Sequence, residues 1–118
     1  MTTGIFITGT DTGVGKTVAA TALLRLAGRE GLRAVGLKPV ASGSERRPGG
    51  LRNEDAEALR AAASVALPYE TVNPFCFEPA IAPHLAAREA GMPVHLADLT
   101  AWYERAASGA DVAIVEGA

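Results

Sequence analysis

A glycine-rich stretch near the N-terminus has the residue types and spacing of a phosphate-binding loop. It spans Gly9 to Thr17, follows the apolar run Ile5-Phe6-Ile7 and precedes a segment with helical periodicity. Glycines let backbone N–H groups approach phosphate oxygens, and the N-terminus of the next helix adds partial positive charge there. Lys16 can bridge the distal phosphates, and the Thr17 hydroxyl can ligate Mg²⁺. The stretch therefore predicts binding of a nucleoside triphosphate.

The loop departs from the common spacing in one respect. The usual pattern has four residues between its first glycine and the Gly-Lys pair. Here Thr10 stands at that first position, and the nearer glycine, Gly9, leaves five. A glycine-rich turn without phosphate chemistry is the alternative interpretation. The strand pattern before the loop, the helical pattern after it and the intact Gly15-Lys16-Thr17 favour a phosphate site.

Alternating strand and helix patterns predict the scaffold that positions this loop. We expect strands at about residues 4–8, 33–38 and 112–115, and helices at about 16–29, 54–64, 83–91 and 96–107. This order predicts an α/β fold, a doubly wound and mostly parallel sheet of the P-loop NTPase kind with right-handed crossovers. Ligands bind such sheets at the carboxyl ends of the strands.

Composition predicts that two connecting segments are irregular. Residues 40–50 are rich in Ser, Gly and Pro, and residues 67–83 are interrupted by prolines. Between them, Asn53 is expected to cap the helix that follows it. Each segment therefore serves as a loop in this interpretation.

Helical periodicity predicts which side chains face the core. In the helix at 16–29, one apolar stripe contains Val18, Ala22 and Leu26. In the helix at 96–107, Trp102 and Tyr103 lie on the apolar stripe, which favours a core role over a base-stacking platform.

Polar residues follow the second and third expected strands, so they should meet the phosphate loop at one edge of the sheet. Glu116 ends four consecutive apolar residues and stands where a second Mg²⁺ ligand is expected beside Thr17. Lys38 ends the second strand and would be a second cation for transferred phosphate. A solvated strand end is the alternative for each of them.

Three further polar residues are ambiguous from the pattern alone. Asp55 lies in the first turn of a helix, where an acid also complements the helix dipole. Ser42 and Ser44 could donate hydrogen bonds to an anionic substrate, but serines in a glycine-rich loop usually form turns.

Composition limits the class of protein. The chain has 118 residues, a formal net charge of −2 and one cysteine, Cys76. These values predict one small domain over residues 1–118, disfavour nucleic acid or an anionic membrane as partner, and exclude an internal disulfide. No apolar run of membrane-spanning length and no signal-like N-terminus is evident, so cytoplasm is expected. Because the chain ends just past its third strand, we expect the domain to be incomplete.

Several motifs together resemble those of dethiobiotin synthetase, an ATP-dependent enzyme family of biotin synthesis. The matching segments cover essentially the whole chain: residues 8–17, Lys38–Ser44, Leu51–Asn53 with Asp55, Val72–Phe75, Pro83-His84 and Val115–Ala118. Phosphate loops occur in many families, whereas the segment Lys38–Ser44 is much more specific. The five-residue spacing after Gly9 is normal for this family.

The resemblance implies a ligase reaction with ATP as co-substrate. CO₂ adds to an amine of 7,8-diaminopelargonate to give a carbamate, ATP phosphorylates that carbamate, and the second amine closes the ureido ring. By motif match, Lys38, Lys16 and Thr12 are implied to act in catalysis, and Ser42 is implied to contact the substrate. The family also implies a homodimer with the substrate near its interface.

The resemblance further implies a nucleotide and metal site. The implied nucleotide-binding residues are Gly13, Val14, Gly15, Lys16, Thr17, Val18, Asp55, Glu116 and Gly117. Thr17, Asp55 and Glu116 match the Mg²⁺ ligands, which decides the role left open for Asp55. Gly13 stands where relatives often carry an acid. Chains of this family are about twice as long, so we expect correspondence to the N-terminal half.

Three other functions remain alternatives. One is a related amide-forming synthetase of cobyrinate type, which the segment Lys38–Ser44 disfavours. Another is a nucleotide-switch ATPase, whose loop usually carries an early second lysine that Thr10-Asp11-Thr12 lacks. The last is an inactive fragment that binds nucleotide weakly.

Overall fold

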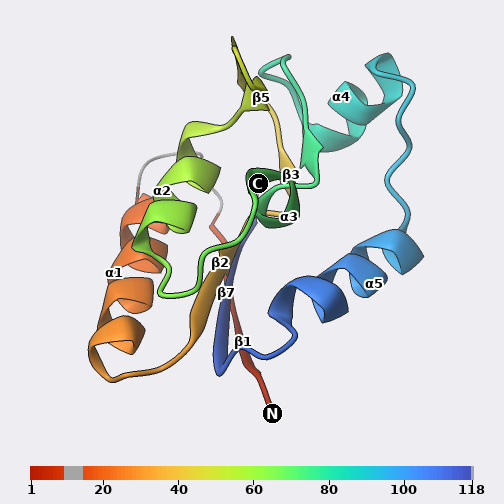
Figure 1. Ribbon diagram of the computed structural model, residues 1–118. Coiled ribbons are helices and arrows are strands. Elements are labelled where there is room, and N and C mark those ends of the chain that lie inside the picture. Colours follow the sequence, from red (N-terminus) through yellow and green to blue (C-terminus); the bar gives the residue numbers. More distant parts are fainter. Residues whose placement is uncertain (10–14, 118) are drawn as a thin grey trace.

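Three parallel strands form the central sheet of the protein (Figure 1). The computed structural model describes residues 1–9 and 15–117. The sheet has the order β1 (Thr3–Ile7), β7 (Val112–Glu116), β2 (Ala34–Leu37). Ile7 pairs with Glu116, and Leu37 pairs with Val115. The carboxyl ends of all three strands therefore lie at one edge, and the three expected strands are confirmed.

Helices cover both faces of this sheet, as expected for a doubly wound fold (Figure 1). Helices α1 (Gly15–Arg29) and α2 (Glu54–Ala62) pack on one face, where Ile114 contacts a core that includes Leu24 and Leu59. Helix α5 (Leu96–Ala107) packs on the other face, where Trp102 joins a core with Val115. Successive residues of β7 thus serve opposite cores, which follows from the alternation of side chains along a strand.

The face of α1 that packs on the sheet differs from the predicted one. Ala20, Leu24 and Ala27 are buried, whereas Val18 and Leu26 are 62% and 54% exposed. Periodicity alone does not fix the rotation of an alanine-rich helix, because several stripes are similarly apolar.

Close packing between α1 and β2 selects the observed rotation. A Cβ atom on Gly36 would lie only 2.8 Å from Leu24 Cδ1 and 3.0 Å from Leu59 Cβ. The absence of a side chain at Gly36 therefore lets Leu24 reach the sheet.

The segments expected to be irregular contain short elements of regular structure. They are β3 (Val40–Ala41), β4 (Glu45–Arg47), β5 (Gly50–Arg52), α3 (Tyr69–Val72) and β6 (Phe75–Cys76). Strands β3 and β6 pair in parallel, and β4 and β5 form an antiparallel hairpin. The expectation of two plain loops was wrong, because strands of two or three residues depend on partners that a local pattern does not reveal.

The remaining helices begin and end close to the predicted residues. Helix α4 (Pro83–Glu89) has its proline in the first turn, and Gly91 follows it with a φ of 66°. Asn53 caps α2, since its side chain accepts from Ala56 N over 3.0 Å. Within residues 1–9 and 15–117, the helices lack the combination of length and apolarity that a membrane crossing needs.

Candidate active site

A buried carboxylate joins two of the predicted site residues. Glu116 is the last residue of β7 and is 0% exposed. Its Oε1 accepts a hydrogen bond from Thr17 Oγ1 over 2.6 Å, and its Oε2 accepts one from Lys38 Nζ over 3.1 Å. The start of α1, the end of β2 and the end of β7 therefore meet at one carboxylate.

The Lys38 ammonium group is almost enclosed by oxygen atoms. Lys38 is 5% exposed. Its Nζ also donates to the carbonyl of Gly117 over 3.2 Å and lies 3.8 Å from Asp55 Oδ2. Buried charges need partners of this kind, because an unpaired buried charge is strongly destabilising.

Asp55 supplies the solvent-facing side of this cluster. Its side chain is 44% exposed, in contrast to Lys38 and Glu116. Asp55 lies in the first turn of α2, the helix that begins after the cap at Asn53. An exposed carboxylate beside a buried ion pair leaves oxygen atoms accessible to a ligand from solvent.

The phosphate loop is described at both of its ends. The Lys16 side chain extends over Gly9, where an added Cβ would lie 3.4 Å from Lys16 Cδ. Gly15 begins α1, and Val18 is exposed in its first turn. Thr12, Gly13 and Val14 lie outside the described residues. Gly117 extends the pairing of β1 with β7, since its N–H donates to the carbonyl of Ile7 over 2.9 Å.

The two serines of the Lys38–Ser44 segment have different surroundings. Ser42 is half-buried just after β3, and within the described chain no hydrogen bond joins it to the Lys38–Glu116 pair. Ser44 is buried, and its backbone N–H donates to the carbonyl of Phe77 over 3.0 Å. Its Oγ is buried and has no hydrogen-bond partner among the described residues.

Two residues behind Lys38 were not predicted as site residues. The Tyr69 hydroxyl accepts from Asn53 N over 2.6 Å and donates to Asn73 Oδ1 over 2.9 Å. Asn73 Nδ2 in turn donates to the carbonyl of Lys38 over 2.8 Å. Burial raises the pKa of Tyr69 to about 12, although its bond from Asn53 N–H opposes this rise. No periodicity marks these contacts, because α3 has only four residues, although Asn73 lies in the segment Val72–Phe75 that resembles the family.

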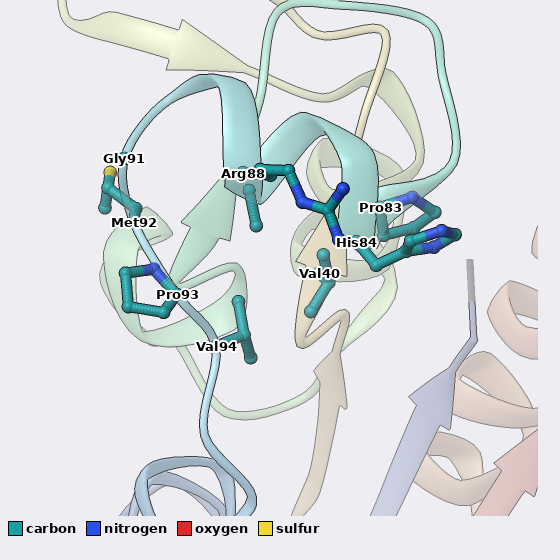
Figure 2. A pocket seen from close by; sticks show the side chains of 9 residues that line it. Val40, Pro83, His84, Arg88, Gly91, Met92, Pro93 and Val94 are labelled. Carbon is teal, nitrogen blue, oxygen red and sulfur yellow. The ribbon is translucent and has the colours of Figure 1, made fainter.

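A cavity of about 560 Å³ lies elsewhere, beside α4 (Figure 2). It is bounded by Val40, by α4 and by residues 91–94, and its polar side chains are His84 and Arg88. Lys38 and Glu116 do not line it. The Lys38–Glu116 pair therefore lies outside the lining of this cavity, although Val40 from the Lys38–Ser44 segment is part of it.

The cluster at the sheet edge has the oxygen donors that Mg²⁺ prefers. Thr17 offers a hydroxyl, and Asp55 and Glu116 offer carboxylates. Mg²⁺ usually takes one or two carboxylates and completes its shell with phosphate and water. Across the described residues, no group of three or more His, Cys, Asp or Glu side chains forms a cage of its own. This donor set thus fits a metal bound together with a phosphate ligand.

Known proteins with related sequences bear on this site. The model of the family described as AAA domain matches residues 3–118. A protein named ATP-dependent dethiobiotin synthetase BioD from Pseudomonas aeruginosa (strain UCBPP-PA14) is 56% identical over 114 residues, covering 96% of this chain and 50% of that protein. Proteins of the same name from two other bacteria are also similar to this chain. The one from Aeromonas hydrophila is 48% identical over 119 residues, covering 100% of this chain and 53% of its own.

A third relative carries the same name and also matches this chain over only part of its own length. It comes from Marinobacter nauticus and is 56% identical over 89 residues, covering 75% of this chain and 38% of its own length. The chain thus spans about half the length, or less, of the curated relatives it matches. Since the family model matches nearly all of its residues, the chain belongs to the AAA domain family and is a homologue of the dethiobiotin synthetases.

Proposed function

We propose that this protein takes part in the ATP- and Mg²⁺-dependent closure of the ureido ring of dethiobiotin from 7,8-diaminopelargonate and CO₂. The observation that carries the proposal is the Glu116 carboxylate, which holds Thr17 and Lys38 together beside the phosphate loop. The similarity to proteins named dethiobiotin synthetase supports the choice of substrates.

The reaction needs two anions held side by side. An amine of the substrate attacks CO₂ and loses a proton, which gives a carbamate. A carbamate oxygen then attacks the γ-phosphorus of ATP, and ADP leaves. The second amine attacks the carbamate carbon, and inorganic phosphate leaves as the ring closes. Carbamate and triphosphate repel each other, so the site must supply positive charge between them.

Lys38 and Lys16 are the proposed sources of that charge. Lys38 is held in place by Glu116 and Gly117, so its ammonium group is preorganised before substrate binds. Lys16 lies in the first turn of α1, next to Thr17. Charge of this kind stabilises the phosphoryl group most strongly during its transfer, so Lys38 should affect turnover more than binding.

Three oxygen-bearing side chains are proposed to hold Mg²⁺: those of Thr17, Asp55 and Glu116. The metal would neutralise phosphate charge when bound. On the family resemblance, Thr12 is proposed to contact the carbamate and Ser42 the substrate. We also propose nucleotide contacts along residues 13–18 and at Gly117, a homodimer, and a cytoplasmic location.

The experiment that tests this proposal measures ADP release by the complete protein. The expected result is release that requires 7,8-diaminopelargonate and bicarbonate together, with Mg²⁺ and ATP present. ADP release that is independent of both compounds would instead indicate a nucleotide-switch ATPase. Release with another acid and an amine donor would indicate an amide synthetase.

A further inference from the structure

The peptide of Lys38 is held by a different part of the chain from its side chain. Pairing of β2 with β7 extends to Leu37, which is opposite Val115. One residue later, Lys38 N donates to the carbonyl of Val72 over 2.8 Å, and the Lys38 carbonyl accepts from Asn73 Nδ2. The backbone of Lys38 is therefore oriented by α3 and the residue that follows α3.

The hydrogen bonds of Asn73 have only one consistent direction. Its Nδ2 faces two carbonyl oxygens, that of Lys38 at 2.8 Å and that of Phe75 at 3.2 Å. A flipped amide would place its oxygen against these acceptors. Asn73 Oδ1 must therefore be the acceptor for the Tyr69 hydroxyl, and Asn73 is 2% exposed.

Tyr69 connects this chain of bonds to Asp55. Its hydroxyl donates to Asn73 and so accepts from the Asn53 N–H. Asn53 caps α2, and Asp55 is the second residue of that helix. The Tyr69 hydroxyl therefore links two groups. One is Asn73, which bonds to the Lys38 carbonyl, and the other is the N–H of Asn53, which caps the helix turn that carries Asp55.

The ring of Tyr69 is fixed independently of its hydroxyl. The Arg52 guanidinium lies over the ring at 4.3 Å from its centroid, and Tyr69 is 5% exposed. Because burial raises the pKa of Tyr69, the hydroxyl keeps its proton across the neutral range and remains a donor.

We propose that Tyr69 and Asn73 are positioning residues, which hold Lys38 and Asp55 at a fixed separation for phosphoryl transfer. The expected loss of turnover rests on the proposed function, whereas the expected loosening of the Lys38 peptide rests on the hydrogen bonds alone. A shift of about 1 Å in a reacting group can cost a hundredfold in rate, so a small relaxation of these bonds would be visible in turnover.

Two variants of the complete protein test the proposal, Tyr69→Phe and Asn73→Ala. Each is expected to lower kcat about 10- to 100-fold, with KM for ATP changed by no more than about twofold. Because both break one chain of bonds, the double variant should be no slower than the slower single variant. Independent, multiplying losses would contradict a shared positioning role.

Trp102→Phe is the matched control. Trp102 Nε1 donates to the carbonyl of Thr71 over 2.6 Å, so this change also removes a hydrogen bond to α3, but it leaves the side-chain bonds of Tyr69 and Asn73 intact. It should lower stability while leaving kcat within about twofold of the parent. If Trp102→Phe and Tyr69→Phe lose kcat equally, loosened packing explains the loss, and the proposal is overturned.

Amide hydrogen exchange separates failure of this inference from failure of the proposed function. In Tyr69→Phe, the Lys38 amide should exchange at least about tenfold faster, while the Ile114 amide in β7 is unchanged. This measurement needs no substrate, so it decides the positioning role even if the parent protein makes no dethiobiotin. Unchanged exchange at Lys38 would show the proposal to be wrong.

Discussion

Thr17 and Glu116 are 99 positions apart in sequence, and the hydroxyl of one donates to the carboxylate of the other over 2.6 Å. The second carboxylate oxygen accepts from Lys38 over 3.1 Å. Both oxygens of a fully buried group are thus occupied, one by a residue of α1 and one by the residue that follows β2. A substitution of Thr17 or Lys38 is therefore expected to change the position of the Glu116 carboxylate relative to the other residue.

Lys38→Met should separate nucleotide binding from turnover. The long apolar stem is retained but the charge is lost, and removing one such group from a transition-state site typically costs about 10²- to 10³-fold in kcat. The dissociation constant of ATP should change by no more than about threefold, whereas Lys16→Ala should weaken ATP binding strongly. Calorimetry and initial rates check both values, and near-normal turnover of Lys38→Met would refute its role.

A double variant controls for stability in that experiment. Breaking a buried ion pair from one side costs about 3–5 kcal/mol, because the remaining charge is unpaired. Lys38→Met with Glu116→Gln should therefore recover much of the free energy of unfolding, while turnover stays absent because this variant lacks both the ammonium group and a proposed Mg²⁺ ligand. Recovered turnover would mean that the single variant was only unstable.

Thr17→Val should raise the Mg²⁺ concentration needed for half-maximal nucleotide binding by about tenfold or more. Valine keeps the shape of the side chain and removes the hydroxyl that donates to Glu116. Thr17→Ser keeps the hydroxyl and is the control. The prediction is wrong if the valine and serine variants respond to Mg²⁺ alike.

Gly36→Ala should lower the free energy of unfolding by about 1–3 kcal/mol, because the added methyl overlaps a tightly packed contact. Its Cβ would lie 2.8 Å from Leu24 Cδ1 and 3.1 Å from the backbone oxygen of Leu59. Gly28→Ala, whose Cβ would lie 3.6 Å from Ser64, is the control and should be neutral or stabilising. Denaturant titration compares the two, and equal effects would speak against the described packing of α1 and α2 on β2.

Stability should fall between about pH 10 and pH 12 through Tyr69. Its pKa is raised in the folded protein to about 12 from an ordinary value near 10.0, first by burial. In that window the unfolded chain binds fewer protons than the folded one, so deprotonation favours unfolding. The full contribution is present below pH 10 and amounts to at most about 2–3 kcal/mol. Tyr69→Phe should show a shallower decline, and identical pH profiles would contradict the shift.

Much of the scaffold could be predicted from the sequence because its signals are local. The apolar run of β7 indicated a buried strand, and the periodicity of residues 96–107 indicated α5. The buried face of α1 could not be predicted, because Leu24 is placed by its contact with Gly36 rather than by a dominant stripe. The short strand pair β3 and β6 depends on contacts between distant segments.

The site residues also fall into those that could be predicted from the sequence and those that could not. Thr17, Lys38 and Glu116 could be brought together by reasoning that parallel strands end at one edge. Asp55 needed the family resemblance, since an acid in a first helical turn has an ordinary explanation. The contacts of Tyr69 and Asn73 could not be derived from a local pattern, because they join residues 16 and 35 positions apart through the side chains of a four-residue helix and of the residue that follows it.

We propose that the Lys38–Glu116 site phosphorylates a carbamate. The most direct test follows oxygen from ¹⁸O-labelled CO₂ or bicarbonate into inorganic phosphate during turnover of the complete protein with unlabelled water and ATP. If a carbamate oxygen attacks the γ-phosphorus, the released phosphate carries an ¹⁸O atom, and labelling disappears without 7,8-diaminopelargonate. Phosphate that contains only oxygen from ATP and water would show that water is the attacking group, and would contradict the proposed reaction.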